Sequence, residues 1–116
     1  MDELLQMIYG THPKSIKLYP EARKVIDHLR EKGAVKREDL ANFLMIDINS
    51  ASGKKHFYNI ISPMFDKILV SERRGKEVYY HLSYDLFRVY IDGIRRKSKY
   101  YLLSNPDQEK DEQNEQ

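Results

Sequence analysis

Residues 68–83 constrain the fold of this chain more strongly than any other stretch of its 116 residues. Two segments, residues 68–72 and 77–82, flank the basic turn Arg73-Arg74-Gly75-Lys76. The second segment alternates apolar and polar side chains, which is the pattern of a half-buried strand, and a turn that contains glycine is typical of a hairpin. The sequence therefore predicts a two-stranded β-hairpin with a basic tip.

Three helices are predicted ahead of the hairpin, over residues 20–32, 37–46 and 51–67, because apolar side chains recur there at the spacing of one helical face. Pro63 should either kink the third helix or end it. A short helix over residues 2–9 and an extended stretch over residues 15–19 are expected at the N-terminus. The side chains expected to point inward from the three helices are Ala22, Val25, Ile26, Leu29, Leu40, Ala41, Leu44, Phe57, Ile61, Met64 and Ile68.

A last helix is predicted over residues 84–103, with Ser83 as its cap. Its apolar side chains cover an arc of roughly 220°, about twice what docking on one small domain requires. We expect the surplus to pack against a second copy of the chain, helped by the N-terminal helix. The alternative is that both sides pack inside one compact monomer. The predicted dimer contacts are Leu4, Leu5, Ile8, Leu86, Phe87, Tyr90, Ile91, Ile94, Tyr101 and Leu102.

The predicted order is helix, short strand, helix, polar turn, helix, hairpin and helix, which is the winged helix-turn-helix arrangement. Leu69-Val70, the basic turn and Val78-Tyr79-Tyr80-His81-Leu82-Ser83 together resemble the wing of the PadR and ArsR families of regulators. The resemblance implies a mainly α protein with a β-hairpin wing, of the α+β class, that carries a C-terminal dimerisation helix. The composition, rich in Lys, Ile and Tyr without Cys or Trp, is similar to that of small archaeal winged-helix proteins.

The chain then divides into an N-terminal helix and linker (1–19), a winged helix-turn-helix DNA-binding domain (20–83), a dimerisation helix (84–104) and an acidic tail (105–116). Residues 106–116 carry a net charge of −4, whereas the rest of the chain carries +6. A basic body favours a polyanionic partner. The tail has no aliphatic or aromatic side chain, so we expect it to be disordered and regard it as a candidate contact for a protein partner.

The third predicted helix buries one face, so its opposite face could carry polar and basic side chains into the major groove of DNA. Asparagine can pair with adenine through two hydrogen bonds, lysine can approach guanine, and serine or tyrosine can hold phosphates. The basic hairpin tip would lie on the DNA backbone or in the adjacent minor groove. The predicted DNA-binding residues are Ser50, Ser52, Lys54, Lys55, His56, Tyr58, Asn59, Ser62, Arg73, Arg74 and Lys76.

These features predict a homodimer that binds double-stranded DNA sequence-specifically and acts as a transcriptional repressor. A two-fold dimer would place two recognition helices about one turn of DNA apart, which requires a pseudo-palindromic site. Two alternatives fit the same pattern: a plasmid-partition or architectural protein that spreads along DNA, and a winged-helix module that binds proteins. A footprint longer than one site would indicate the first alternative. Binding that survives charge reversal at Lys55 and Arg74 would indicate the second.

Nothing in the sequence predicts an enzyme. Cysteine is absent, so the thiolate metal site of typical ArsR sensors cannot form. The four histidines lie in different predicted elements, and there is no phosphate loop or glycine-rich dinucleotide turn, so we expect no metal and no cofactor. No apolar run approaches the ~18 residues that span a bilayer, and the N-terminus lacks the basic region of a signal peptide. We therefore expect a cytoplasmic protein with no membrane partner.

Overall fold

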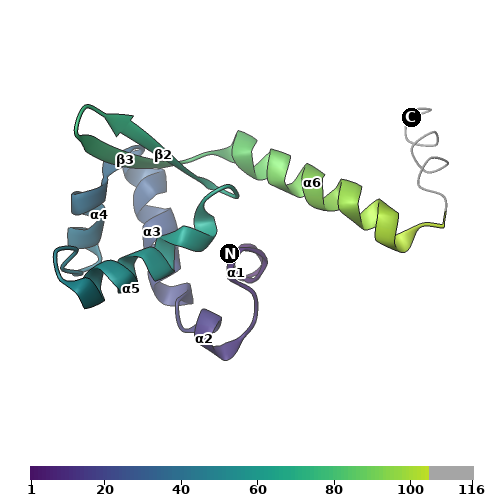
Figure 1. Ribbon diagram of the computed structural model, residues 1–116, viewed down its shortest axis with the longest axis horizontal. Coiled ribbons are helices and arrows are strands. Elements are labelled where there is room, and N and C mark those ends of the chain that lie inside the picture. The colour runs from purple at the N-terminus through teal and green to yellow at the C-terminus, as the bar shows by residue number, and fades with distance from the viewer. Residues whose placement is uncertain (105–116) are drawn as a thin grey trace.

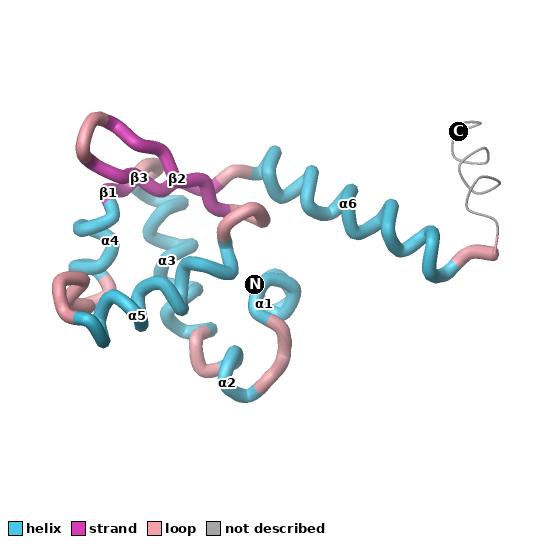
Figure 2. The backbone as a smooth tube through the Cα atoms, viewed as in Figure 1, coloured by secondary structure: helices cyan, strands magenta, loops and turns pink. Residues whose placement is uncertain are grey.

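The computed structural model describes residues 1–104, and the predicted acidic tail lies outside this range. Within it the chain is of the α+β class: a three-stranded antiparallel sheet, in the order β1-β3-β2, lies against a group of helices (Figures 1 and 2). The helices are α1 (Asp2–Tyr9), α2 (Pro13–Ile16), α3 (Tyr19–Lys32), α4 (Arg37–Phe43), α5 (Ala51–Ile61), the 3₁₀ turn η1 (Ser62–Met64) and α6 (Tyr84–Leu102). The strands are β1 (Val35–Lys36), β2 (Leu69–Arg74) and β3 (Glu77–Leu82).

The hydrophobic core lies between α3, α4, α5 and the sheet. Phe57 of α5 is fully buried, and its ring lies 6.4 Å from the ring of Tyr80 on β3. The side chains predicted to point inward from the three central helices are all buried, except Leu44, which is half-buried against the same core. Helical periodicity therefore predicted the packing faces of these helices correctly.

The N-terminal helix α1 belongs to this core. Leu5 and Ile8 were predicted at a dimer interface, but both are buried within one chain, so that prediction is wrong for these two residues. The physical reason is that α1 packs beside the end of α5, where the Tyr9 hydroxyl donates a hydrogen bond to the carbonyl of Ile60. Leu4 is half-buried at the edge of the same core.

The extended stretch predicted over residues 15–19 is also wrong. The chain forms the short helix α2 there, and α3 begins directly afterwards at Tyr19. Pro13 occupies the first turn of α2, where a missing N–H costs nothing, and the Nδ1 atom of His12 accepts a hydrogen bond from the backbone N–H of Lys14 at 3.2 Å. Capping by a histidine is a weak signal in a sequence, because serine, threonine, aspartate and asparagine are the usual caps.

Helix α4 ends three residues before the predicted boundary. Ile46 donates its backbone N–H to the carbonyl of Ala41 at 2.9 Å, and Met45 donates to Asn42 at 3.0 Å. This pair of bonds is the Schellman motif, which places the residue after the helix in the left-handed region. Met45 takes that conformation, with φ +59°, although glycine is the usual residue at such a position.

Pro63 ends α5 rather than kinking it. Proline has no N–H to donate, and its ring clashes with the carbonyl four residues earlier in a continuing α-helix. The chain instead makes the 3₁₀ turn η1 and then reverses at Asp66, which has φ +65°. The predicted helix over residues 51–67 is therefore shortened to Ala51–Ile61, which settles the question that the sequence left open.

The predicted hairpin forms, with Leu69 paired to Leu82 and Arg74 paired to Glu77. The two-residue turn begins at Gly75, whose φ of +65° is costly for any residue with a Cβ atom. Strand β1 adds to the free edge of β3, where Val35 pairs with Tyr80. The hairpin is therefore attached to the helical body and does not stand alone.

Helix α6 begins as predicted, with the Ser83 hydroxyl accepting a hydrogen bond from the backbone N–H of Leu86 at 3.1 Å. It then extends away from the body, on the side opposite α4 (Figure 1). None of its residues is buried, although Phe87 at its start packs against the core. The alternative in which both sides of this helix pack inside one monomer is therefore not what the fold adopts.

Candidate nucleic-acid interface

The outer face of α5 carries the polar side chains that the sequence assigned to nucleic-acid contact. Phe57, Ile60 and Ile61 fix the orientation of this helix by entering the core. Several side chains outside this buried face are exposed and, among residues 1–104, form no hydrogen bond or ion pair with another residue. The side chains in this unpaired set are Ser52, Lys54, Lys55, Asn59 and Ser62. They are free to meet an external ligand.

The start of α5 is held by Ser50. Its hydroxyl accepts a hydrogen bond from the backbone N–H of Gly53 at 2.9 Å and donates one to the carbonyl of Asp47 at 3.0 Å. Ser50 therefore caps the helix, and its donor is already used, although the sequence assigned it to DNA contact. Gly53 is required by close packing, because a Cβ atom built there would lie 1.9 Å from the carbonyl oxygen of Asp47.

His56 has a partner inside the chain. Its Nε2 atom lies 2.9 Å from a carboxylate oxygen of Glu21, so the two side chains tie α5 to α3. The pair is partly exposed, and a carboxylate beside the imidazole offsets its charge whenever the ring is protonated. His56 is therefore a weaker partner for an anion than the unpaired lysines Lys54 and Lys55.

Tyr58 contacts a residue that sequence analysis missed. Its hydroxyl accepts a hydrogen bond from the guanidinium of Arg37 at 3.3 Å, and the same guanidinium lies 3.4 Å from the carboxylate of Glu38. The hydrogen bond to Tyr58 is the main reason that the pKa of Arg37 is raised further above its usual value. Arg37 lies 21 residues before Tyr58 at the start of α4, and no periodicity relates the two positions.

The hairpin tip presents the three predicted cations, and all of them are exposed. Arg74 is the most constrained, because its guanidinium carbon lies 4.4 Å from the centre of the Tyr79 ring and one of its nitrogens lies 3.3 Å from Glu72. Arg73 and Lys76 form no hydrogen bond or ion pair with other residues of the described chain. They are the unpaired charges of the tip.

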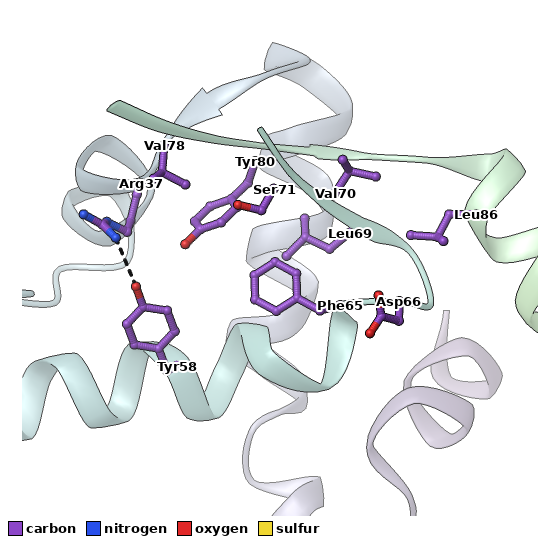
Figure 3. A pocket seen from close by; sticks show the side chains of 10 residues that line it. All are labelled: Arg37, Tyr58, Phe65, Asp66, Leu69, Val70, Ser71, Val78, Tyr80 and Leu86. Atoms are coloured by element: carbon purple, nitrogen blue, oxygen red, sulfur yellow. Dashed lines mark hydrogen bonds between the residues drawn. The ribbon is translucent and has the colours of Figure 1, made fainter. Parts of the chain in front are cut away.

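A cavity of about 640 Å³ lies between α5 and the hairpin (Figure 3). Arg37 and Tyr58 occupy one end of it, and Asp66 and Leu86 lie at the other, with the rings of Phe65 and Tyr80 between them. Burial is the main reason that the pKa of Tyr80 is raised well above its usual value. The Tyr80 phenol therefore stays protonated and acts as a hydrogen-bonding group, not as an anion.

The two basic features lie at one end of the body. In Figure 1 the hairpin tip and the start of α5 are both on the side away from α6. The sequence predicted that both would carry exposed cations, and this is confirmed for Lys54, Lys55 and the hairpin tip. These exposed cations can meet a polyanion, whereas Ser50, His56 and Tyr58 already have partners within the chain.

No side-chain cluster in residues 1–104 has the three or more His, Cys, Asp or Glu residues that a metal site would need. Across the same range, no helix combines the length and apolar character required to cross a membrane. Comparisons of the chain with protein families, with characterised proteins and with solved structures found no match.

Proposed function

We propose that this chain is a winged helix-turn-helix protein that binds double-stranded DNA as a homodimer and represses transcription. In this proposal α4 and α5 form the helix-turn-helix, α5 is the recognition helix, and the β2–β3 hairpin is the wing. The observation that carries it is the set of unpaired polar side chains on α5, a helix that starts on the same side of the body as the cations of the hairpin tip.

The chemistry of the α5 face suits base edges in the major groove. Asn59 is exposed near the C-terminal end of α5, and its amide can donate and accept at once, as recognition of adenine requires. Lys55 lies one turn earlier and can reach an acceptor on guanine. Arg73 and Lys76 at the hairpin tip suit phosphates or a narrow minor groove, because they are long, exposed and unpaired.

Helix α6 supplies the proposed dimer contact. Phe87, Ile94 and Tyr101 recur at intervals of seven residues, with Tyr90 and Ile91 between them, which is the spacing of a helix that packs against another helix. Ile94 is 40% exposed and Tyr101 is 86% exposed in the single chain. A soluble monomer rarely leaves such a stripe uncovered, and pairing with the same helix of a second copy would cover it.

The experiment that tests the proposal is a DNA-binding titration at two salt concentrations. One duplex has a random sequence, and the other carries the DNA upstream of the gene that encodes this chain. We expect tighter binding to the upstream duplex, and weaker binding to both duplexes at higher salt because counterions are released when phosphates are neutralised.

Two results would change the assignment. If neither duplex binds even at low salt, the α5 face and the hairpin do not bind DNA, and a protein partner becomes the better explanation of the exposed surfaces. If the footprint on the upstream duplex grows cooperatively beyond one site, the chain spreads along DNA as an architectural or partition protein would.

A further inference from the structure

A second, smaller cavity lies between the start of α4, the turn that follows it and the first turns of α5. Its volume is about 180 Å³, and it is lined by Arg37, Glu38, Ile48, Asn49, Lys54 and Tyr58. The hydrogen-bonded pair of Arg37 and Tyr58 also lines the larger cavity beside the hairpin, so this pair separates the two spaces. Unlike its larger neighbour, the small cavity has a lining that is mostly polar.

The polar groups of this small cavity are those that bind phosphate. A guanidinium, an ammonium, a phenol and a side-chain amide converge from three separate elements. The carboxylate of Glu38 is the opposing charge, so the cavity carries a net charge of +1 from Arg37, Lys54 and Glu38. The guanidinium of Arg37 donates hydrogen bonds to the hydroxyl of Tyr58 and to the carboxylate of Glu38, so its position is fixed before any ligand binds.

Two cationic donors in this cavity are unused, and the buried Oε2 atom of Glu38 is an acceptor that also has no hydrogen-bond partner. The Nε atom of Arg37 is buried and has no hydrogen-bond partner, and the Nζ atom of Lys54 forms no hydrogen bond or ion pair with residues 1–104. A buried donor without a partner destabilises the fold, so an incoming acceptor that reaches Arg37 would relieve part of that cost. A phosphate offers several acceptor oxygens and a negative charge.

We infer that the small cavity is the binding site of one backbone phosphate of the DNA, which Arg37 and Lys54 hold. This inference rests on the proposed function. In helix-turn-helix proteins the first helix crosses the DNA backbone while the second enters the major groove, and Arg37 begins α4. Tyr58 is a positioning residue. Its hydroxyl fixes the guanidinium of Arg37, and it lies between this phosphate site and the α5 side chains proposed to contact bases.

The test is the salt dependence of DNA affinity for Arg37→Gln, Lys54→Gln and the double variant. Each phosphate that a protein neutralises contributes about 0.9 to the slope of log affinity against log salt concentration. If both cations serve one phosphate, the double variant loses about 0.9 in total and not twice that value. The preference for the upstream duplex over the random duplex should stay unchanged, because a phosphate carries no sequence information.

The matched controls lie on α6, away from the proposed DNA-binding end. Arg88→Gln removes an exposed arginine that is paired with Asp85 at 3.5 Å, much as Arg37 is paired with Glu38. Lys97→Gln removes an exposed lysine. Both controls should keep the wild-type slope. Tyr58→Phe keeps the ring and removes only the hydroxyl, so it should weaken binding to both duplexes while leaving the slope close to the wild-type value.

The outcomes separate this inference from the proposed function. If the wild-type chain binds with a steep slope and the double variant keeps that slope, the phosphate site is wrong while DNA binding stands. If the variants that carry Arg37→Gln do not fold, as judged by far-UV circular dichroism, Lys54→Gln carries the test through affinity: it should weaken binding to both duplexes alike, and an affinity equal to that of Lys97→Gln would overturn the inference. The last experiment titrates the protein with inorganic phosphate at millimolar concentration and follows the amide resonances around Asn49 by NMR. If these resonances shift and saturate while the variants keep the wild-type salt slope, the cavity binds free phosphate and the inference is overturned.

Discussion

Gly53 occupies a position in α5 where even one added carbon atom has no room. A Cβ atom there would meet the carbonyl oxygen of Asp47 at 1.9 Å and the hydroxyl of Ser50 at 2.6 Å. The same two residues cap and orient the helix, so the angle at which α5 leaves the preceding turn depends on the absence of a side chain. In the proposed function this angle decides where Asn59 and Lys55 point.

Gly53→Ala should therefore destabilise the protein, by about 1–3 kcal/mol, although alanine normally favours a helix over glycine by about 1 kcal/mol. The measurement is the free energy of unfolding in urea. Gly93→Ala in α6 is the matched control, because a Cβ atom at Gly93 would meet nothing within 4 Å. That substitution should leave stability unchanged or raise it, and equal losses in the two variants would show that close packing at Gly53 is not the cause.

Asn59 is the residue on which sequence preference should depend. Asn59→Ala should reduce the affinity for the specific duplex by about 1–3 kcal/mol, because one bidentate contact to a base is lost. Binding to the random duplex should change little. The measurement is the ratio of the two dissociation constants at one salt concentration.

Arg73→Ala is the contrasting variant for Asn59→Ala. It removes an unpaired cation of the hairpin tip, so it should weaken binding to both duplexes alike and lower the salt slope. An Asn59→Ala protein with an unaltered preference for the upstream duplex would mean that α5 is not the element that reads the bases.

At the scale of elements, sequence periodicity predicts helix bounds and buried faces that depend on neighbouring residues. It does not predict features that depend on contacts between residues far apart in the chain. Helix α3 follows its predicted bounds to within one residue, because its apolar face and its terminal glycine are local signals. The end of α4 could not be predicted, since a methionine occupies the left-handed position where glycine is the recognisable signal. Arg37 was missed at the candidate site because its contact with Tyr58 depends on how α4 and α5 pack.

The pairing of β1 with β3 carries a pH-dependent contact. The Nζ atom of Lys36 lies 2.9 Å from a carboxylate oxygen of Glu77, and Tyr79 donates a further hydrogen bond to that carboxylate at 3.1 Å. The hydrogen bond from Lys36 is the largest cause of a lowered pKa at Glu77, and that from Tyr79 is the next. A carboxyl group whose pKa is lower in the folded state stabilises the fold above its unfolded pKa, and this stabilisation is lost as the pH falls through the folded pKa.

The melting temperature of the wild-type chain should therefore fall more steeply than that of Glu77→Gln as the pH drops from about 5 to about 3. The effect should be small, because both side chains are partly exposed to solvent, which screens the pair. Thermal unfolding followed by circular dichroism measures it. Glu31→Gln removes an exposed carboxylate that has no ion pair within residues 1–104, and it should follow the wild-type profile. Parallel curves for wild type and Glu77→Gln would contradict the prediction.

At the scale of the whole molecule, the body and α6 differ in how they are stabilised. The body has a continuous core from α1 to β3, whereas α6 has no buried residue and contacts that core only near its start. The sequence predicted the excess of apolar surface on α6 from its angular spread, and the exposed stripe agrees with that expectation. What sequence reasoning could not separate is which apolar side chains of the N-terminal helix belong to the core and which remain at the surface.

Ile94→Glu should abolish the proposed dimer, because it places a charge at the centre of the stripe formed by Phe87, Ile94 and Tyr101. Light scattering coupled to size-exclusion chromatography should give a dimer mass for the wild type and a monomer mass for the variant. Arg88→Glu changes a residue outside this stripe and should remain dimeric. On a duplex with two half-sites, Ile94→Glu should bind about 100-fold more weakly than the wild type. In the monomeric variant, the second DNA-binding domain is no longer attached to the first, so its binding is not intramolecular. On a single half-site the variant and the wild type should bind alike. A wild-type chain that is monomeric at micromolar concentration and still protects two half-sites would show that DNA, and not α6, brings the two copies together.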